Sequence, residues 1–355
     1  LAAWLPPLGQ PVAWLSGRTK GQARQQVLQA LASGDAPLVV GTHALFQHDV
    51  HFHRLGLIIV DEQHRFGVHQ RLSLADKGVG DEHPHQLALT ATPIPRSLAM
   101  VAYGDLDCSV IDELPPGRQP VTTTLMDHTR RDAVMRRVGN ACREGRQAYW
   151  VCTAIEESDT LDIEAAEATL DQLQQALPDV QIGLVHGKLK PAEKATVMAA
   201  FKAGEIQLLV ATTVIEVGVD VPNASLMIID NAERLGLAQL HQLRGRVGRG
   251  AVDSHCLLLY RQPLSDTAQQ RLKVMQESHD GFVIAEADLE IRGPGELLGT
   301  RQTGLAAFRI ALLPEHEPLL VEAQDIAARL YARDPGRAKA LMQRWAGARA
   351  DFARV

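Results

Sequence analysis

Short apolar runs of strand length alternate along this chain with stretches of helical periodicity, and this alternation restricts the fold more than any other feature of the sequence. In the first third, we predict strands at residues 12–15, 38–40, 55–60 and 87–89, with a helix over 20–32. Such alternation is typical of a parallel sheet with helices on its faces. The run at 55–60 reads as apolar throughout, so we expect a central strand buried on both faces.

The same alternation returns after a stretch rich in proline and glycine at residues 114–120, which is the best candidate for a linker between domains. In this second part, strands are predicted at 148–152, 181–185, 207–210, 226–229 and 256–260, and helices at 161–177 and 192–203. Two helices without a strand between them, at 265–277 and 282–291, predict a helical hairpin. A glycine-rich segment at 292–304 and a helical tail from 317 to 345 follow it.

Four regions are therefore expected. They are a truncated α/β lobe at residues 1–117, a complete α/β lobe at 118–262, a hairpin with its loop at 263–312 and a helical tail at 313–355.

Composition narrows the class of protein. The net charge of −6 argues against a protein that binds a polyanion over its whole surface. Between residues 234 and 250 there are four arginines and no acidic residue, so any nucleic-acid footprint should be local. No run approaches the ~20 apolar residues that cross a bilayer, so no membrane partner is expected. Four cysteines without a C-x-x-C pair favour buried, reduced thiols in a cytosolic protein.

An acidic pair follows the apolar run at 55–60. Asp61 and Glu62 come directly after it, and ligands of parallel sheets bind beyond the carboxyl ends of the strands. In P-loop ATPases an aspartate here holds Mg²⁺ against the phosphates of ATP, and a neighbouring residue orients the attacking water. Acidic pairs at strand ends are also common as solvated turns. A second motif is therefore needed to choose between a solvated turn and an ATP site. Segments 41–43 and 90–93 also follow strands and are expected on the same rim.

The partner motif is QLRGRVGR at residues 242–249. It sets Arg246 and Arg249 three residues apart, which would place both on one face of a helix. Guanidinium groups stabilise the charge that develops on a transferred phosphoryl group. Gly245 and Gly248 are poor residues for a helix interior, so we expect a close approach of another backbone or a ligand there.

The phosphate-binding loop that such a site needs, G-x-x-x-x-G-K-[ST], is missing from the sequence. The nearest match, GLVHGK at 183–188, has three residues between its glycines and no hydroxyl after the lysine. The chain also begins with Leu1, inside ordinary globular sequence. We therefore expect a motor whose nucleotide cradle has been cut off, with negligible ATP hydrolysis by the chain itself.

These motifs resemble motifs II, III, V and VI of superfamily 2 helicases, with DEQH at 61–64, TATP at 90–93, VATTVIEVGVDVP at 210–222 and the arginine motif. Longer strings resemble the RecG family of ATP-dependent DNA branch-migration helicases: DEQHRFGV at 61–68, LTATPIPR at 89–96, DELPPGR at 112–118 and RGPGELLGTRQTG at 292–304. The likeness runs nearly end to end. It implies two RecA-like parallel-sheet lobes, the first truncated, then a helical hairpin and C-terminal helices. The family's wedge domain and Walker A loop would precede Leu1.

The resemblance also implies roles for single residues. Asp61 would hold the Mg²⁺ that accompanies ATP, and Glu62 would activate water. Gln242, Arg246 and Arg249 would sense the γ-phosphate, and Asp220 would contact the nucleotide. The candidates for contacting DNA, or for coupling it to the state of ATP, are Thr42, His64, Thr90, Thr92, Thr213, Arg292, Arg301 and Gln302.

The implied function is an ATP-dependent double-strand DNA translocase and helicase that remodels stalled forks and Holliday junctions in recombination and repair. Its partners would be branched or duplex DNA and a single-strand-binding protein, in the bacterial cytoplasm at the nucleoid. Two alternatives stay open. Transcription-repair coupling translocases carry a motif related to that at 292–304, and a non-catalytic DNA-binding or interaction module would carry decayed motor motifs. Dimerisation through an open apolar edge of the first lobe is a separate hypothesis.

Overall fold

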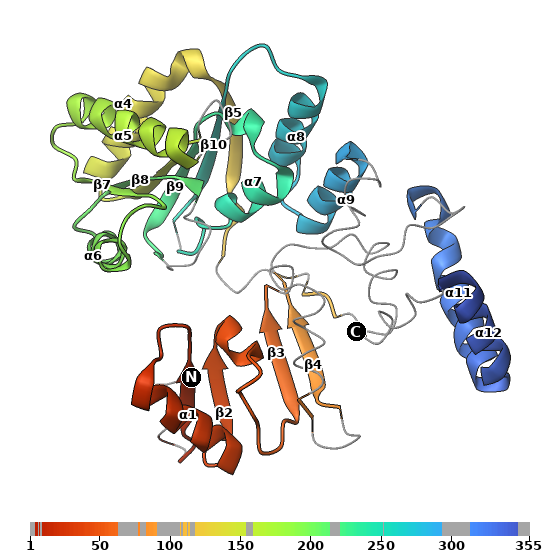
Figure 1. Ribbon diagram of the computed structural model, residues 1–355. Coiled ribbons are helices and arrows are strands. Elements are labelled where there is room, and N and C mark those ends of the chain that lie inside the picture. Colours follow the sequence, from red (N-terminus) through yellow and green to blue (C-terminus); the bar gives the residue numbers. More distant parts are fainter. Residues whose placement is uncertain are drawn as a thin grey trace. The chain divides into compact units, whose positions relative to one another are not determined.

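The computed structural model describes residues 4, 5, 7, 9–62, 77–78, 83–90, 107, 109–111, 113, 118–153, 159–213, 221–250, 252–292 and 313–346. The chain divides into two compact units. The first comprises Leu1–Ala91, Leu298–Leu312 and His316–Val355, and the second comprises Thr92–Leu297 and Leu313–Glu315. Each is described on its own below (Figure 1). The predicted linker at 114–120 lies mostly outside the described residues, and the four predicted domain boundaries stay predictions.

A six-stranded sheet forms the second unit, with all strands parallel and in the order β5-β10-β9-β6-β8-β7. Its strands are β5 (Thr122–Asp127), β6 (Gln147–Val151), β7 (Ile182–Val185), β8 (Leu208–Ala211), β9 (Ala224–Ile229) and β10 (His255–Tyr260). Every residue of β6, β8 and β9 is buried, as expected for parallel strands covered on both faces. The five strands predicted here are all present. β5 was missed because its threonine-rich first half lacks an apolar run.

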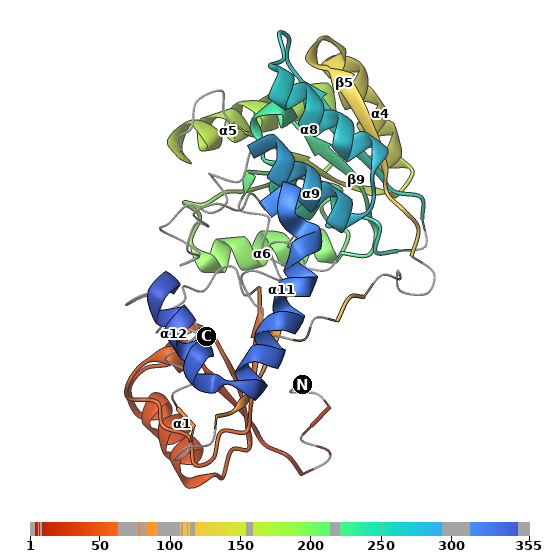
Figure 2. The same cartoon turned by 90° about the vertical axis from the view of Figure 1, so that its right-hand side faces the viewer.

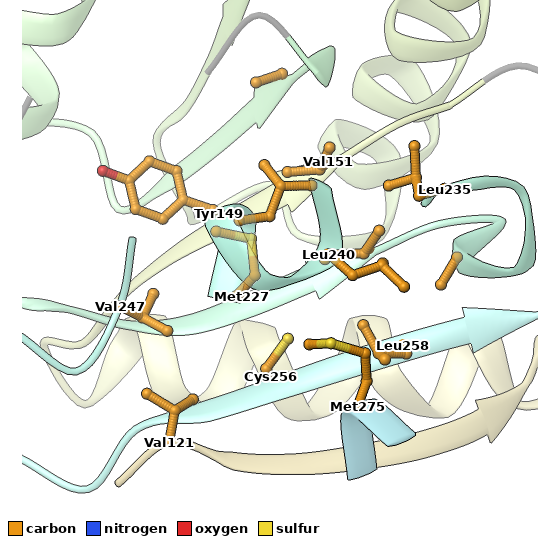
Figure 3. Packing of buried hydrophobic residues seen from close by; sticks show 14 of the residues in the cluster. Val121, Tyr149, Val151, Met227, Leu235, Leu240, Val247, Cys256, Leu258 and Met275 are labelled. Atoms are coloured by element: carbon orange, nitrogen blue, oxygen red, sulfur yellow. The ribbon is translucent and has the colours of Figure 1, made fainter. Parts of the chain in front are cut away.

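Helices cover both faces of this sheet (Figures 1 and 2). Successive residues of a strand point to opposite faces, so Trp150 packs with the helices of one face and Tyr149 with those of the other. Figure 3 shows the cluster that contains Tyr149. The first face carries α4 (Arg131–Arg143) and α5 (Asp159–Ala176). The other carries α6 (Pro191–Lys202), α7 (Leu237–Arg244), α8 (Asp266–Glu277) and α9 (Gly281–Arg292). The predicted helical hairpin is α8–α9, and both helices contact α7. Short 3₁₀ turns occupy His128–Arg130 and Ala232–Arg234.

The cysteines of this unit behave as the sequence predicts. Cys142, Cys152 and Cys256 are buried free thiols. Burial raises the pKa of Cys152 and Cys256 to about 12, so both stay protonated and unreactive at neutral pH.

The described strands of the first unit form two separate two-stranded parallel sheets. β1 (Val12–Leu15) pairs with β2 (Leu38–Gly41), and α1 (Gly21–Ser33) connects them. A 3₁₀ turn at His43–Phe46 follows β2. β3 (Leu57–Asp61) pairs with β4 (His85–Leu89).

The prediction that residues 55–60 form a strand buried on both faces was wrong. In β3 only Ile58 is buried, while Leu57 and Ile59 are 55% and 57% exposed. Residues in register on neighbouring strands share a face. Ile59 is in register with Leu87, and Leu57 and Leu89 lie on the same face, directly across from His85 and Asp61 respectively. Among the described strands β3 pairs only with β4, and the four large apolar side chains of this face are exposed to solvent.

Two helices end the described chain, α11 (Leu313–Arg333) and α12 (Pro335–Ala346), where the sequence predicts a helical tail. Asp334 separates them, and its Oδ1 accepts a hydrogen bond from the Arg337 N–H at 3.0 Å. This bond and Pro335 at the first helical position are typical of a helix start. None of the helices in the described ranges is long and apolar enough to cross a membrane.

Candidate functional site

The acidic pair lies where the sequence predicts it, at the carboxyl end of a parallel strand. Asp61 is the last residue of β3 and is in register with Leu89 at the end of β4, so Thr90 follows at the same end of the ribbon. Asp61 is exposed, and its Oδ1 accepts a hydrogen bond from the backbone N–H of Glu62 at 2.9 Å. The structure thus brings Asp61, Glu62 and Thr90 to one rim.

Glu62 has a left-handed backbone, with φ +53°. This conformation costs a residue with a Cβ about 1–2 kcal/mol and is concentrated at functional sites. The hydrogen bond from its N–H to Asp61 offsets part of this cost. The turn ends the strand directly after Asp61, which leaves the carboxylate at the sheet rim in solvent.

Thr42 belongs to a different sheet. It follows β2, which pairs with β1, and its N–H donates to the Leu15 carbonyl oxygen at 3.1 Å. Within the residues that the structure describes, no strand pairing joins the β1–β2 and β3–β4 sheets. Strand register places the segments of Asp61 and Thr90 on one rim, and the place of Thr42 on that rim stays a prediction. Five other candidates lie outside the described residues: His64, Thr92, Asp220, Arg301 and Gln302.

The arginine motif departs from its predicted form. α7 ends at Arg244, and Gly245 caps it. Arg246 and Arg249 therefore lie beyond the helix, and the expectation that they share a helical face was wrong. Gln242 remains in the last turn of α7. Arg249 is exposed, and its Nε donates to the Gly245 carbonyl oxygen at 3.3 Å.

Gly248 explains why the segment after α7 has its shape. Its φ is +78°, and a Cβ at this position would lie 2.6 Å from Cγ2 of Val121. Nε of Arg118 donates to the Gly248 carbonyl oxygen at 3.1 Å. A close approach is thus present at Gly248, and its partner is the side chain of Val121 in the segment leading into β5, where another backbone or a ligand was expected. At Gly245 the nearest atoms to the Cβ position are the carbonyl oxygens of Gln242 (3.4 Å) and His241 (3.5 Å), so the expectation is not met there.

Arg244 is a residue that the sequence reasoning missed. It is 4% exposed, and its Nη1 donates to Oγ1 of Thr123 and to the carbonyl oxygens of Met275 (2.9 Å) and Ser278 (2.8 Å). One guanidinium thus ties α7 to β5 and to the end of α8. Its spacing from Leu237 and Leu240 could have identified Arg244 as a buried residue, because this spacing places it on the apolar face of α7.

Two buried polar atoms mark the carboxyl ends of β7 and β8. Nδ1 of His186 and Oγ1 of Thr212 have no hydrogen-bond partner in the part of the chain that the structure describes. The Thr212 N–H donates to the Val185 carbonyl oxygen at 3.2 Å, so the two strand ends are adjacent. The predicted residue Thr213 follows directly. An unpaired buried polar atom costs about 1–3 kcal/mol, which fits a surface that a ligand completes. Arg292, the last residue of α9, is the remaining described candidate.

Family models match three successive parts of the chain. A DEAD/DEAH box helicase model matches residues 4–101, and a helicase conserved C-terminal domain model matches residues 130–251. The model for ATP-dependent DNA helicase RecG, domain 3, C-terminal, matches residues 278–344.

Individual relatives agree with these models. The chain is 64% identical over 344 residues to the ATP-dependent DNA helicase RecG of Escherichia coli (strain K12), over 96% of this chain and 50% of that protein. It is 58% identical over 354 residues to the protein of the same name from Pasteurella multocida, over 99% of this chain and 51% of that protein.

Solved structures give the same result. A structure of RecG bound to a three-way DNA junction is 42% identical, with a TM-score of 0.66, over 89% of this chain and 41% of that one. The DNA-bound DUF1998 helicase MrfA, at 18% identity and a TM-score of 0.56, supports the helicase fold alone. The chain spans about half the length of the curated relatives that it matches, and it belongs to the RecG family.

Proposed function

We propose that this chain is part of an ATP-dependent DNA helicase that moves on duplex DNA and remodels branched DNA in recombination and repair. The observation that carries the proposal is the placement of Asp61 and Glu62 at the carboxyl end of β3, in a chain 64% identical to a named RecG helicase. The structure of RecG on a three-way junction supports DNA as the partner.

Asp61 would hold Mg²⁺ beside the phosphates of ATP. Magnesium is usually bound by one or two carboxylates together with phosphate oxygens and water, and an exposed carboxylate at a strand end suits it. Bound Mg²⁺ would neutralise charge on the phosphates. Glu62 follows directly and would orient the attacking water, with its position fixed by the left-handed turn.

Gln242, Arg246 and Arg249 would bind the γ-phosphate and stabilise the charge that develops on it, and Asp220 would contact the nucleotide. Support comes from the glycine-bounded segment after α7, which Arg118 and Val121 hold in place. A preorganised guanidinium stabilises a transition state more effectively than a flexible one, because it needs no reorganisation during the reaction.

Arg244 would transmit movement of this segment to the hairpin α8–α9. Its hydrogen bonds to the carbonyl oxygens of Met275 and Ser278 link the end of α8 to α7, so the two would move together. The residues that would then contact the DNA backbone, or couple to it, are Thr42, His64, Thr90, Thr92, Thr213, Arg292, Arg301 and Gln302. Such contacts position a protein on DNA without reading its sequence, so binding should depend strongly on salt.

Two rival functions are disfavoured. The match of a RecG-specific model to residues 278–344 argues for this family over a transcription-repair coupling translocase. The acidic pair and both arginines of QLRGRVGR are intact, which argues against a decayed, non-catalytic interaction module.

The 355-residue chain alone should hydrolyse ATP negligibly, because no G-x-x-x-x-G-K-[ST] loop is available to bind the phosphates. It should also bind DNA weakly and without sequence preference. A contact with a single-strand-binding protein and a place at the bacterial nucleoid are part of the same proposal.

Steady-state ATP hydrolysis with three-way junction DNA tests the proposal. It would compare this chain with a chain extended to the length of its relatives, each with and without Glu62→Gln. We expect activity in the extended chain only, and its loss in Glu62→Gln. Hydrolysis by the 355-residue chain would contradict the argument from the missing loop, and inactivity of both chains would favour a non-catalytic module.

A further inference from the structure

A polar pocket of about 220 Å³ lies at the carboxyl end of the six-stranded sheet, on the half of the sheet away from β7. His128 follows β5, Thr153 follows β6, Asp230 follows β9 and Arg261 follows β10. Thr169 and Gln172 of α5 line the pocket as well. None of these residues belongs to the motifs assigned above to nucleotide or DNA.

The inner wall of the pocket carries a carboxylate whose charge is already neutralised. Oδ2 of Asp230 accepts from Nε1 of Trp150 at 2.8 Å and from Nε of Arg131 at 3.2 Å. The remaining nitrogens of Arg131 donate to Oε1 of Gln172 at 2.6 Å and to Oγ1 of Thr169 at 3.2 Å. Asp230 is the only acidic residue among the described residues that line the pocket. The Arg131–Asp230 pair thus leaves no net charge on this wall.

The rim carries a second guanidinium, and that one is exposed. Nε of Arg261 donates to Oδ1 of Asn231 at 2.9 Å, and its Nη2 lies 2.9 Å from Nε2 of His128. A guanidinium can only donate, so Nε2 of His128 accepts, and the neutral ring carries its proton on Nδ1. Burial, and then the charge of Arg261, lower the pKa of His128, which agrees with a neutral ring.

Three donors of the pocket residues are left without acceptors. They are Nη1 of Arg261, Nδ1 of His128 and Nε2 of Gln172, and none has a hydrogen-bond partner within the described ranges. The acceptors Oδ1 of Asn231 and Oε1 of Gln172 are both occupied. One buried acceptor, Oδ1 of Asp230, also has no hydrogen-bond partner within the described ranges, and Glu233 interacts with the charge of Arg261. The three spare donors outnumber this one acceptor, and Arg131 neutralises Asp230, so the pocket favours an oxyanion.

The size of the pocket decides which oxyanion fits. Sites for drug-sized ligands usually measure about 300–1,000 Å³, and this pocket is smaller. It can therefore hold a single tetrahedral group but not a whole nucleotide.

We propose that this pocket binds a phosphate group, with Arg261, His128 and Gln172 as its hydrogen-bond donors. The phosphate belongs either to a nucleic-acid backbone or to free phosphate, and the chemistry of recognition is the same. The proposal does not depend on the helicase function, because inorganic phosphate alone tests it.

The first arm of the test is a titration of the intact 355-residue chain with inorganic phosphate through the millimolar range. The ring Cε1–H resonance of His128 is followed by NMR and assigned with His128→Gln. We expect a saturable shift that is lost in Arg261→Gln and several-fold weaker in Gln172→Leu. Arg143→Gln is the matched control, because this exposed arginine lies at the far end of α4 and pairs with Asp179. Absence of a saturable shift in the unchanged chain would overturn the proposal.

The second arm identifies the source of the phosphate. Binding of a fluorescent DNA duplex is measured over a range of salt concentrations. If the phosphate belongs to a DNA backbone, Arg261→Gln lowers the slope of log K against log salt by about one relative to Arg143→Gln. Equal slopes, with the response to inorganic phosphate intact, assign the site to free phosphate. Circular dichroism of each variant checks that the fold is preserved.

Discussion

At the scale of single residues, the candidate site depends on backbone positions that most side chains avoid. Glu62 has φ +53° and Gly248 has φ +78°, one within each of the two motifs. At Glu62 the strained turn ends a strand and leaves Asp61 exposed. At Gly248 the missing Cβ lets the segment after α7 approach Val121. The shape of the chain at each motif thus depends on local backbone geometry.

Gly248→Ala should destabilise the second unit by about 2–4 kcal/mol, because it adds left-handed strain and a Cβ 2.6 Å from Cγ2 of Val121. Urea unfolding followed by far-UV circular dichroism measures this loss. Gly145→Ala is the matched control, because Gly145 has φ +88° but no atom near its Cβ position. Equal losses in both variants would show that the packing against Val121 contributes nothing.

The stability of the protein should fall with acid through His241. Burial, and then Arg244, lower the pKa of His241 in the folded protein to about 4, against 6.5 in the unfolded chain. Between pH 6.5 and 4 the unfolded chain binds a proton at His241 and the folded protein does not. The free energy of unfolding therefore falls by about 3 kcal/mol from pH 6.5 to 4. Urea unfolding of the unchanged protein and of His241→Leu across this pH range measures the pH dependence of the free energy of unfolding, which should be weaker in the variant. The same pH dependence in both proteins would contradict it.

Asp230→Ala should cost about 3–5 kcal/mol, because it leaves the guanidinium of Arg131 and Nε1 of Trp150 buried without their acceptor. The exposed pair of Arg143 and Asp179 provides the control, and Asp179→Ala should have a much smaller effect on the urea midpoint. A similar shift in both variants would mean that the buried pair has no special role in stability.

At the scale of elements, the sequence predicts buried strands well where helices cover both faces. β6, β8 and β9 are apolar runs, and the structure buries each of them completely. β3 is as apolar but is half exposed, since burial depends on what covers a strand and not on its composition alone. The end of α7 was also missed, because the spacing of the arginines in QLRGRVGR is compatible with a helix, whereas α7 ends at Arg244 with Gly245 as its cap.

The open face of the β3–β4 ribbon should make the chain associate with itself and bind apolar dyes. Its exposed members are Leu57, Ile59, Leu87 and Leu89. Ile59→Lys should reduce both self-association in light scattering and the fluorescence of a bound naphthalene sulfonate dye. Gln86→Lys places the same charge on the other face of the ribbon and should change neither. A clean monomer of the unchanged chain at all concentrations would count against the hypothesis of dimerisation.

At the scale of the whole molecule, the sequence was sufficient for the family and for the residues on which the motifs lie. It placed Asp61 at a strand end from local patterns alone. It could not supply contacts between distant residues. Trp150 meets Asp230 across 80 residues of sequence, and Arg244 reaches Ser278 on another element. Such contacts are fixed by packing of the folded sheet, which no local pattern encodes.

The proposed function requires Asp61 and Arg246 to act together in ATP hydrolysis by a chain of the full length of the RecG relatives. The most direct test is single-turnover ATP hydrolysis on three-way junction DNA, in a chain extended to the length of its relatives, with Asp61→Asn, Arg246→Lys and the double variant. Removing an arginine finger slows hydrolysis by about 10³–10⁵-fold, and residues that act as a unit are strongly non-additive. We predict that each single variant is slowed by at least about a hundredfold and that the double variant is no slower than the slower single. Losses that multiply, or a single variant that hydrolyses ATP at the unchanged rate, would contradict the claim.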